Sequence, residues 1–372
     1  MNPSWEEAAT RVDAVFPTRA MAELLATWCL EVEAGQHVVA RSTALASPLM
    51  VALQEAVLAR GAWPVLQAEL PGQAASFYRH ARDEQLDDYD ELAMAEAKGL
   101  DSIVSIQAPY EPHELADTDP ARIARAARGR RPVRERTMKK RWCSTLWPTP
   151  AGAQLAGMEL EEFARFVAGA MFLDRPDPAS AWLQLGRFQE SLIGRLKKVR
   201  EITIEAPGTE LTLSVKGRTW VNSDGQRNMP SGEVFTGPVE TSANGRISFT
   251  IPSSPSGVSV EGVELVFRDG EVVESRAQSG GEYLRRALAT DDGARFLGEI
   301  GIGTNFGIDR PVGAILFDEK IGGTVHLALG RSYPETGGRN ESALHWDLIC
   351  DLRHGGRILA DGEELLADGR FT

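Results

Sequence analysis

The feature that most constrains the fold is a change of sequence pattern near residue 200. Before it, stretches with the 3.6-residue periodicity of amphipathic helices alternate with short runs rich in β-branched residues. After it, short β-prone runs follow one another, separated by Gly, Pro, Ser and Asn. A chain of 372 residues is long enough for two domains of ordinary size. We therefore expect an α/β domain over residues 1–199 and a β-rich α+β domain over residues 200–372.

The first half alternates strand and helix signals. Extended runs begin at His37, Trp63 and Ser102, and helical stretches separate them. The clearest helix begins around Pro48, because proline is favoured in a first helical turn, and Gly61 ends it. Alternating strands and helices are typical of βαβ units, so the pattern predicts a parallel sheet.

Charge limits the partners of the chain. It carries 40 Lys and Arg against 53 Asp and Glu, a formal net charge of −13, which opposes attraction to nucleic-acid phosphates. One stretch, residues 122–141, is strongly basic, but it lacks interleaved aromatic residues and Pro132 divides it. We expect two amphipathic helices with solvated arginines there and no nucleic-acid partner. Binding of nucleic acid by this stretch is the alternative.

Cysteine usage and hydropathy indicate a compartment. Cys29, Cys143 and Cys350 lie far apart and form no zinc or redox motif, so we expect free thiols. The N-terminal stretch is acidic, and no apolar run reaches the ~20 residues that a membrane span requires. We therefore expect a cytoplasmic protein without membrane contact.

Four segments of the second half place ionisable residues beside glycines or within apolar runs. In the last segment His345 and Asp347 are one residue apart in a strand-like run, so both side chains point to the same face. The four segments are 228–238 with Glu233, 297–307 with Glu299, 318–334 with His326 and Tyr333, and 342–352 with His345 and Asp347.

These donors have the composition of a metal site. Three carboxylates and two imidazoles are the mixed oxygen and nitrogen ligands that suit zinc, cobalt or manganese. Three negative charges also balance two divalent cations and one hydroxide, as a hydrolytic site requires. Spacing alone leaves a structural role open for each residue, as an exposed turn acid, a core histidine or a packing aromatic.

Other motifs lose support. The glycines of GIGTNFG are not spaced as in a dinucleotide-binding GxGxxG, and no GxSxG nucleophile motif occurs. The remaining histidines lie in polar, turn or strand-end contexts, where surface or structural roles are expected. They are His37, His80, His113 and His354.

Taken in order, the four segments resemble the metal-site segments of the M29 metallopeptidases, the aminopeptidase T and aminopeptidase S group. Residues 147–166, WPTPAGAQLAGMELEEFARF, resemble the family's PTP-x-x-A-x-x-AGMS-x-EEF segment. Residues 32–62 resemble its opening strand–helix unit. The resemblance covers nearly the whole chain and is weakest over residues 72–141.

The resemblance implies a metal-dependent aminopeptidase that removes N-terminal residues from peptides with broad specificity through two divalent ions (zinc, cobalt, manganese or magnesium), usually as a homodimer. By motif, Tyr333 matches a catalytic tyrosine. We expect Glu299 to bridge the ions and to move a proton, and Glu319 to be a further ligand or a supporting residue. The implied metal ligands are Glu233, Glu299, His326, His345 and Asp347.

One alternative from another class remains. A protein could keep the same site and only bind peptides or metal ions, without hydrolysis. Because Glu299 and Tyr333 are both present, the sequence favours catalysis.

Overall fold

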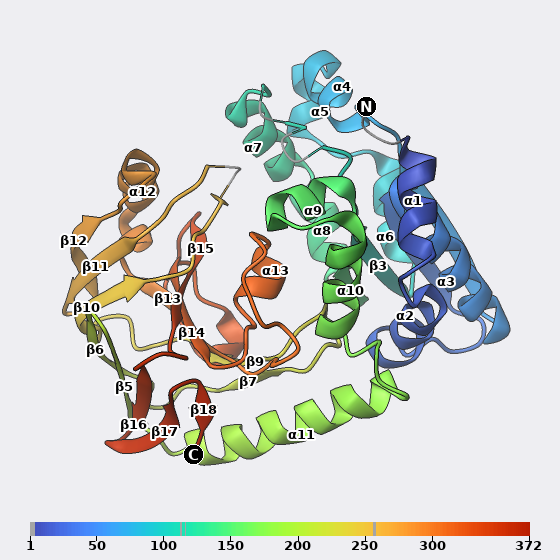
Figure 1. Cartoon of the computed structure of the whole chain (residues 1–372). Coiled ribbons are helices and arrows are strands. Elements are labelled where there is room, and N and C mark those ends of the chain that lie inside the picture. Colours follow the sequence, from blue (N-terminus) through green and yellow to red (C-terminus); the bar gives the residue numbers. More distant parts are fainter. Residues whose placement is uncertain (1–3, 112–113, 116, 256–257) are drawn as a thin grey trace. The chain divides into compact units, whose positions relative to one another are not determined.

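The computed structural model describes residues 4–111, 114–115, 117–255 and 258–372, and Figure 1 labels its elements. The chain divides into two compact units, Met1–Ala179 with Gly225–Met229, and Ser180–Asp224 with Pro230–Thr372. The change of pattern at residue 200 lies inside the second unit. The reason is that the preceding helix, α11, packs Leu192 and Leu196 into the core of that unit.

The N-terminal unit contains a five-stranded sheet in the order β2-β1-β3-β4-β8, and every pairing in it is parallel. The expected parallel α/β architecture is therefore present. Its elements are α1 (Trp5–Asp13), α2 (Thr18–Leu24), β1 (His37–Thr43), α3 (Ser47–Ala59), β2 (Trp63–Glu69), α4 (Gln73–His80), α5 (Asp83–Asp87), α6 (Glu91–Gly99), β3 (Ser102–Gln107), α7 (Pro120–Gly129), α8 (Arg131–Thr137), β4 (Arg141–Leu146), α9 (Pro150–Ala156), α10 (Leu160–Ala170) and β8 (Asn228–Met229).

Helix α3 shows how local sequence builds this unit. Pro48 lies in its first turn, where the missing N–H removes no intrahelical hydrogen bond. Leu49, Leu53 and Val57 recur every four residues and are buried, so they form one apolar stripe. The helix packs against β1 and β2. Gly61 follows it with φ +73°, a left-handed conformation that glycine adopts without strain.

The basic stretch 122–141 forms α7, α8 and the first residue of β4, so the two expected helices are present. Several of its arginines are engaged within the unit. Arg122 Nε donates to the carbonyl oxygen of Tyr78 over 2.8 Å, and Arg125 forms an ion pair of 3.1 Å with Asp83. These contacts favour the interpretation as solvated structural helices. The absence of a nucleic-acid partner stays a prediction.

The C-terminal unit contains two antiparallel sheets, in the orders β12-β11-β10-β6-β5-β16-β17-β18 and β15-β14-β13-β9-β7. Buried side chains of both sheets form one hydrophobic core, so each sheet turns one face inward. The elements are α11 (Pro178–Leu196), β5 (Glu201–Ala206), β6 (Thr209–Ser214), β7 (Val221–Ser223), β9 (Glu233–Thr236), β10 (Asn244–Phe249), β11 (Val263–Arg268), β12 (Glu271–Arg276), α12 (Gly281–Leu288), β13 (Leu297–Gly303), α13 (Ile315–Asp318), β14 (Thr324–Gly330), β15 (His345–Asp351), β16 (Arg357–Ala360), β17 (Glu363–Ala367) and β18 (Arg370–Phe371).

Among the residues that the structure describes, no helix combines the length and the apolar character needed to cross a bilayer. The longest helix of the C-terminal unit, α11, carries charged residues along its length.

Candidate metal centre

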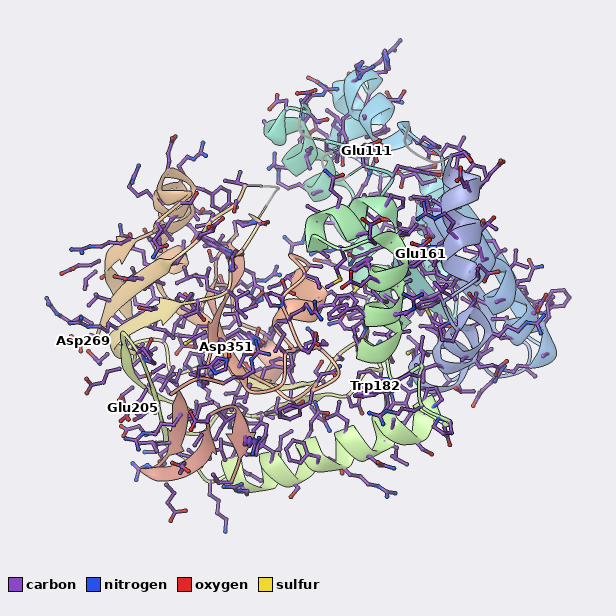
Figure 2. The ribbon with its side chains drawn as sticks, in the orientation of Figure 1. Glu111, Glu161, Trp182, Glu205, Asp269 and Asp351 are labelled. Carbon is purple, nitrogen blue, oxygen red and sulfur yellow. The ribbon has the colours of Figure 1, made fainter. Side chains whose placement is uncertain are left out.

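The predicted donors share one face of the five-stranded sheet of the C-terminal unit, β15-β14-β13-β9-β7. Side chains alternate between the faces of a strand, so His345 and Asp347 on β15 point the same way; Figure 2 labels Asp351, which ends this strand. Leu327 and Leu348, at intervening positions, lie in the hydrophobic core on the other face. The donors on the polar face are Glu233 on β9, Glu299 on β13, His326 on β14, and His345 and Asp347 on β15.

Small residues between the donors leave room for them. Ala328 on β14 is paired with Glu299 on β13 and with Asp347 on β15, so only a methyl group separates the two carboxylates in this row. Gly301 is paired with His326, and a Cβ at position 301 would lie 2.1 Å from the imidazole Cε1. Glycine at 301 is therefore required for the imidazole to lie where it does.

The donors form overlapping clusters around Glu299. His326 Nε2 lies 3.2 Å from Glu233 Oε2 and 3.6 Å from Glu299 Oε1. His345 Nε2 lies 3.6 Å from Glu299 Oε2 and 3.6 Å from Asp347 Oδ2. Within each of these two clusters the donor atoms all lie within 4.8 Å of one another. The structure therefore brings all five predicted donors together, and Glu299 presents one oxygen to each histidine.

The geometry and the unpaired atoms fit divalent cations. Two ligands bonded at about 2.0–2.1 Å to one tetrahedral ion lie roughly 3.3 Å apart, which is close to the spacings of these donor atoms. Glu233 Oε2 and Asp347 Oδ1 are buried and accept no hydrogen bond among the described residues, and Glu233 Oε2 has only the ion-pair contact of 3.2 Å with His326 Nε2. Burying a carboxylate oxygen without a partner is costly, and a cation would remove that cost.

Burial and neighbouring charges also shift the pKa values of side chains in the cluster. It raises the pKa of Glu233 to about 7 and the pKa of Asp347 to about 6. Burial opposes the charged form of His326, but the nearby carboxylates of Glu299 and Glu233 outweigh it and raise the pKa of His326 to about 10. A cation that binds here must therefore displace protons from the cluster.

His345 is held in one tautomer. Its Nδ1 lies 2.8 Å from the carbonyl oxygen of Arg331, which can only accept a hydrogen bond. Nδ1 therefore carries the proton in the neutral imidazole, and the lone pair of Nε2 faces Glu299 and Asp347. Histidines that bind metals are commonly oriented by such a second hydrogen bond.

Tyr333 borders the same cluster. Its hydroxyl oxygen lies 3.4 Å from His345 Nε2, and its ring packs edge-on against His345 and Phe235 with centroid distances of 5.0 and 5.8 Å. Burial, together with the carboxylates of Glu299 and Asp347, raises the pKa of Tyr333 well above its usual value. The phenol therefore stays protonated at neutral pH and remains a hydrogen-bond donor.

Glu319 and Lys320 add to the cluster. Glu319, whose role the sequence left open, offers an oxygen within 4.8 Å of donor atoms of His326 and Asp347. Lys320 is fully buried, pairs with Glu319, and places its Nζ 3.3 Å from Glu233 Oε1. Burial opposes the charge of Lys320, but Glu233 and Glu319 outweigh it and raise its pKa. The sequence analysis missed Lys320, because a lysine beside a glutamate and two glycines is usually exposed.

Gln189 on α11 supports the backbone beside the site and was also missed. Its Nε2 lies 3.0 Å from the carbonyl oxygen of Glu233, 3.2 Å from that of Ser223 and 3.0 Å from Thr304 Oγ1. The side chain is fully buried. A signal existed in the sequence, since Gln189 is a polar residue on the same helical stripe as Leu192 and Leu196.

The remaining histidines do not contribute. His37, His80 and His354 belong to none of the candidate metal clusters in the part of the chain that the structure describes. His113 lies outside the described residues. Only the histidines on β14 and β15 therefore take part in the described clusters.

Comparisons with known proteins identify the family. A sequence model of the family described as thermophilic metalloprotease (M29) matches residues 17–371. The chain belongs to the M29 metallopeptidases. Aminopeptidase 2 of Geobacillus stearothermophilus is 32% identical over 92% of this chain and 94% of its own length. Aminopeptidase T of Thermus thermophilus is 29% identical over 95% of each chain. The prediction of an M29-type metal-dependent hydrolase is confirmed.

Solved structures show the same fold. The structure of wild-type AmpT from Thermus thermophilus matches this M29 chain with a TM-score of 0.83 and 27% identity, over 96% of this chain and 99% of the other. The predicted succession of an α/β domain and a β-rich domain is thereby confirmed. A 2,5-dihydroxypyridine dioxygenase from Pseudomonas putida KT2440 matches with a TM-score of 0.61 at 17% identity, over 95% and 96% of the chains. The fold alone therefore does not specify the chemistry, which must be argued from the donors.

Proposed function

We propose that this M29 protein is a dinuclear metal-dependent aminopeptidase that removes N-terminal residues from peptides. The observation that carries the proposal is the position of Glu299, whose two oxygens face His326 and His345 in separate clusters. A carboxylate placed in this way suits a bridge between two cations. Glu233 completes one cluster and Asp347 the other.

The charge of the cluster supports two ions rather than one. Glu233, Glu299, Glu319 and Asp347 contribute four negative charges, and Lys320 neutralises one of them. Two divalent cations, which can be zinc, cobalt, manganese or magnesium, would polarise the scissile carbonyl and lower the pKa of a bound water. We propose Glu319 as a further ligand, held in place by Lys320.

The residues of the chain supply the remaining steps. Tyr333, kept protonated by its surroundings, would donate a hydrogen bond to the carbonyl oxygen as negative charge develops there in the transition state. Glu299 would accept the proton of the attacking water and pass it to the leaving amine. A free N-terminal amine has a lone pair that could bind a cation held by these carboxylates, whereas an acetylated nitrogen has none available, so the site would favour peptides with a free N-terminus.

The test combines metal content with peptide cleavage. We expect two divalent ions per chain, release of amino acids from free peptides, no release from the same peptides after N-acetylation, and loss of activity on chelation that added metal reverses. Full activity after exhaustive chelation, or equal turnover of acetylated peptides, would contradict the proposal. Stoichiometric metal binding without any hydrolysis would support the alternative, a non-hydrolytic peptide- or metal-binding protein.

We also propose that the protein acts in the cytoplasm as a homodimer, with peptides as its partners. Cys29, Cys143 and Cys350 are buried thiols that form no disulfide, in keeping with a reducing compartment. Light scattering after size-exclusion chromatography tests the oligomeric state, because a dimer has twice the 40.5 kDa mass of one chain.

A further inference from the structure

A cavity of about 350 Å³ opens directly beside the candidate metal centre, within the C-terminal unit. His345 and Asp347 form part of its wall. The other walls come from the segment 251–255, from the start of α13 and from Ile349 on β15. A substrate bound at the candidate metal centre therefore lies against this cavity, which has the size of a small ligand pocket.

The wall next to the donors is apolar. Ile349 follows Asp347 by two residues on β15, so both side chains lie on the polar face of the sheet. Ile251 is paired with Ile349 in an antiparallel bridge, and its N–H donates to the carbonyl oxygen of Ile349 over 3.3 Å. Directly paired residues project to the same side, so the two buried isoleucines form a continuous apolar surface beside Asp347.

The segment that carries Ile251 is tied to the strand of the donors. Ser253 Oγ accepts a hydrogen bond of 2.9 Å from Trp346 Nε1, and Trp346 stands between His345 and Asp347 in sequence. Its ring packs edge-on against Tyr283 with a centroid distance of 5.4 Å. Preformed walls of this kind make a cavity selective, because the protein pays little to order them on binding.

Beyond the candidate ligands, the cavity has one ionisable lining residue, and that residue is buried and held by the backbone. Among its lining residues, Asp318 is the other ionisable group, and its two oxygens accept hydrogen bonds from the N–H groups of Val312 and Gly313 over 2.7 and 2.9 Å. Ile315, at the start of α13, also lines the cavity and is 47% exposed, so it lies at the rim. A lysine or arginine side chain entering here would lose water and meet only a buried carboxylate whose oxygens already accept backbone hydrogen bonds.

Resting on the proposed aminopeptidase function, we propose that this cavity binds the side chain of the N-terminal residue of the peptide and selects apolar side chains such as leucine, methionine and phenylalanine. The Cα of that residue joins the free amine to the scissile carbonyl, and both groups must be held at the metal centre for cleavage. Its side chain therefore starts one bond away from both groups that are held at the metal centre. The side chain beyond the scissile bond starts farther away.

The test measures kcat/KM for amides of leucine, phenylalanine, alanine and arginine. In the unmodified enzyme we expect leucine and phenylalanine to exceed alanine and arginine by about tenfold or more, because each methylene buried in an apolar pocket is worth at least about that factor. Ile251→Phe fills the cavity and should lower the leucine-to-alanine ratio by about tenfold. Ile315→Asp adds a carboxylate at the exposed rim and should shift the arginine-to-leucine ratio upward by about tenfold.

Two comparisons keep this proposal separate from the proposed function. Val273→Asp places the same charge on a 40% exposed apolar residue of β12 in the same unit, and it should leave every ratio unchanged. The dipeptides Leu-Ala and Ala-Leu distinguish the two positions of the substrate. If the enzyme cleaves the amides but neither Ile251→Phe nor Ile315→Asp changes the ratios, this proposal is wrong and the proposed function stands. The same holds if Ile251→Phe lowers kcat/KM for Ala-Leu but not for Leu-Ala, because the cavity would then bind the second residue of the substrate. If the enzyme cleaves no substrate, both are wrong.

Discussion

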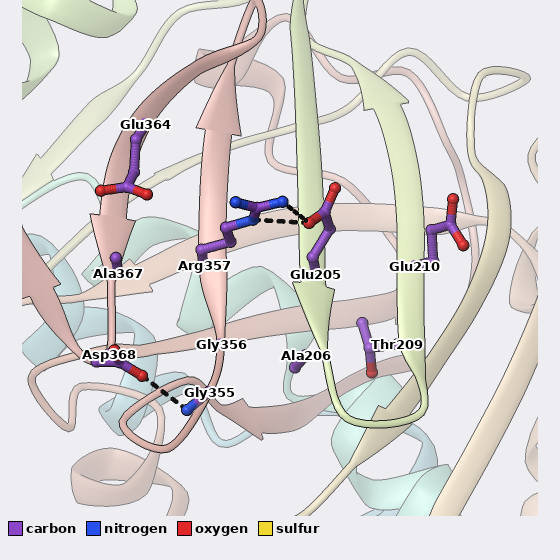
Figure 3. Close-up of a pocket in the computed structure, with 10 residues that line it drawn as sticks. All are labelled: Glu205, Ala206, Thr209, Glu210, Gly355, Gly356, Arg357, Glu364, Ala367 and Asp368. Atoms are coloured by element: carbon purple, nitrogen blue, oxygen red, sulfur yellow. Dashed lines mark hydrogen bonds and ion pairs between the residues drawn. The ribbon is translucent and has the colours of Figure 1, made fainter.

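Two groups of carboxylates in the C-terminal unit differ in their surroundings. On the eight-stranded sheet, Glu205, Glu210 and Glu364 line a hollow of about 720 Å³ (Figure 3). Glu210 and Glu364 are exposed, and Glu205 accepts a hydrogen bond of 2.7 Å from Arg357 Nε. On the five-stranded sheet of the C-terminal unit, Glu233 and Glu299 are buried and Asp347 is partly buried, and one oxygen each of Glu233 and Asp347 accepts no hydrogen bond among the described residues.

The contrast indicates that burial of the carboxylates, and not their number or the volume of the hollow beside them, is what favours binding of a cation. Water and Arg357 already satisfy the outer group, so a cation gains little there. The inner group has lost its water, so its charges depend on Lys320, on protons or on bound cations. Perturbed pKa values therefore occur in the smaller, buried cluster.

The comparison is tested most strongly by removing one carboxylate from each group. Glu299→Gln should lower kcat/KM by about 10³-fold or more, because the proposed bridge and proton acceptor are lost together. Glu364→Gln, on the outer face, should stay within about twofold of the unmodified enzyme. Steady-state kinetics with metal analysis measures both. Equal losses in the two variants would contradict the distinction between the groups.

Removing the buried cation should reveal the cost of the inner charges. Lys320→Met removes the ammonium that pairs with both Glu233 and Glu319, so the metal-free protein should lose about 3 kcal/mol in free energy of unfolding. The loss should be smaller once metal is bound, because cations then neutralise the same carboxylates. Denaturant unfolding with and without metal measures this, with the exposed Lys216→Met as the matched control. An equally small effect in both variants would show that Lys320 does not balance the cluster.

The hydroxyl of Tyr333 is tested by its removal. Tyr333→Phe should lower kcat about 10²-fold, because one donor to the developing oxyanion is lost. KM and the metal content should change little, since the ring and its packing against Phe235 remain. A loss of metal from this variant would instead assign the tyrosine a structural role at the site.

The smallest expected effect is a dependence of metal affinity on pH, which the buried carboxylates should show between pH 8 and pH 5.5. Glu233 and Asp347 have pKa values raised to about 7 and about 6, so they hold protons that a metal must displace as the pH falls below 7. Metal affinity should therefore decrease by about tenfold per pH unit for each group that must deprotonate. Chelator competition between pH 8 and pH 5.5 measures the slope. An affinity that stays constant over this range would contradict the raised pKa values.

Much of the local structure could be predicted from the sequence. The strands at His37, Trp63 and Ser102 and the helix from Pro48 follow from hydrophobic periodicity and from proline and glycine signals. The placement of His345 and Asp347 on one face follows from the alternation of a strand. These are properties of neighbouring residues, so a short window of sequence contains them.

The assembly of the candidate site could not be predicted from spacing. Glu233 and Asp347 lie more than a hundred residues apart in the sequence, and only the resemblance to M29 proteins suggested that they meet. Their proximity depends on the register of β9, β13, β14 and β15. A slip by one residue would turn a donor into the hydrophobic core.

The sequence by itself determined which segments form strands and helices, which residue types can bind a metal, and to which family the chain is related. Only the tertiary structure decided that Lys320 is buried against Glu233, that Gln189 supports the backbone of the site, and that an apolar cavity lies beside His345. The physical reason is that periodicity is a local property of the chain. Burial, pKa and distance depend instead on which distant strands pair and in which register.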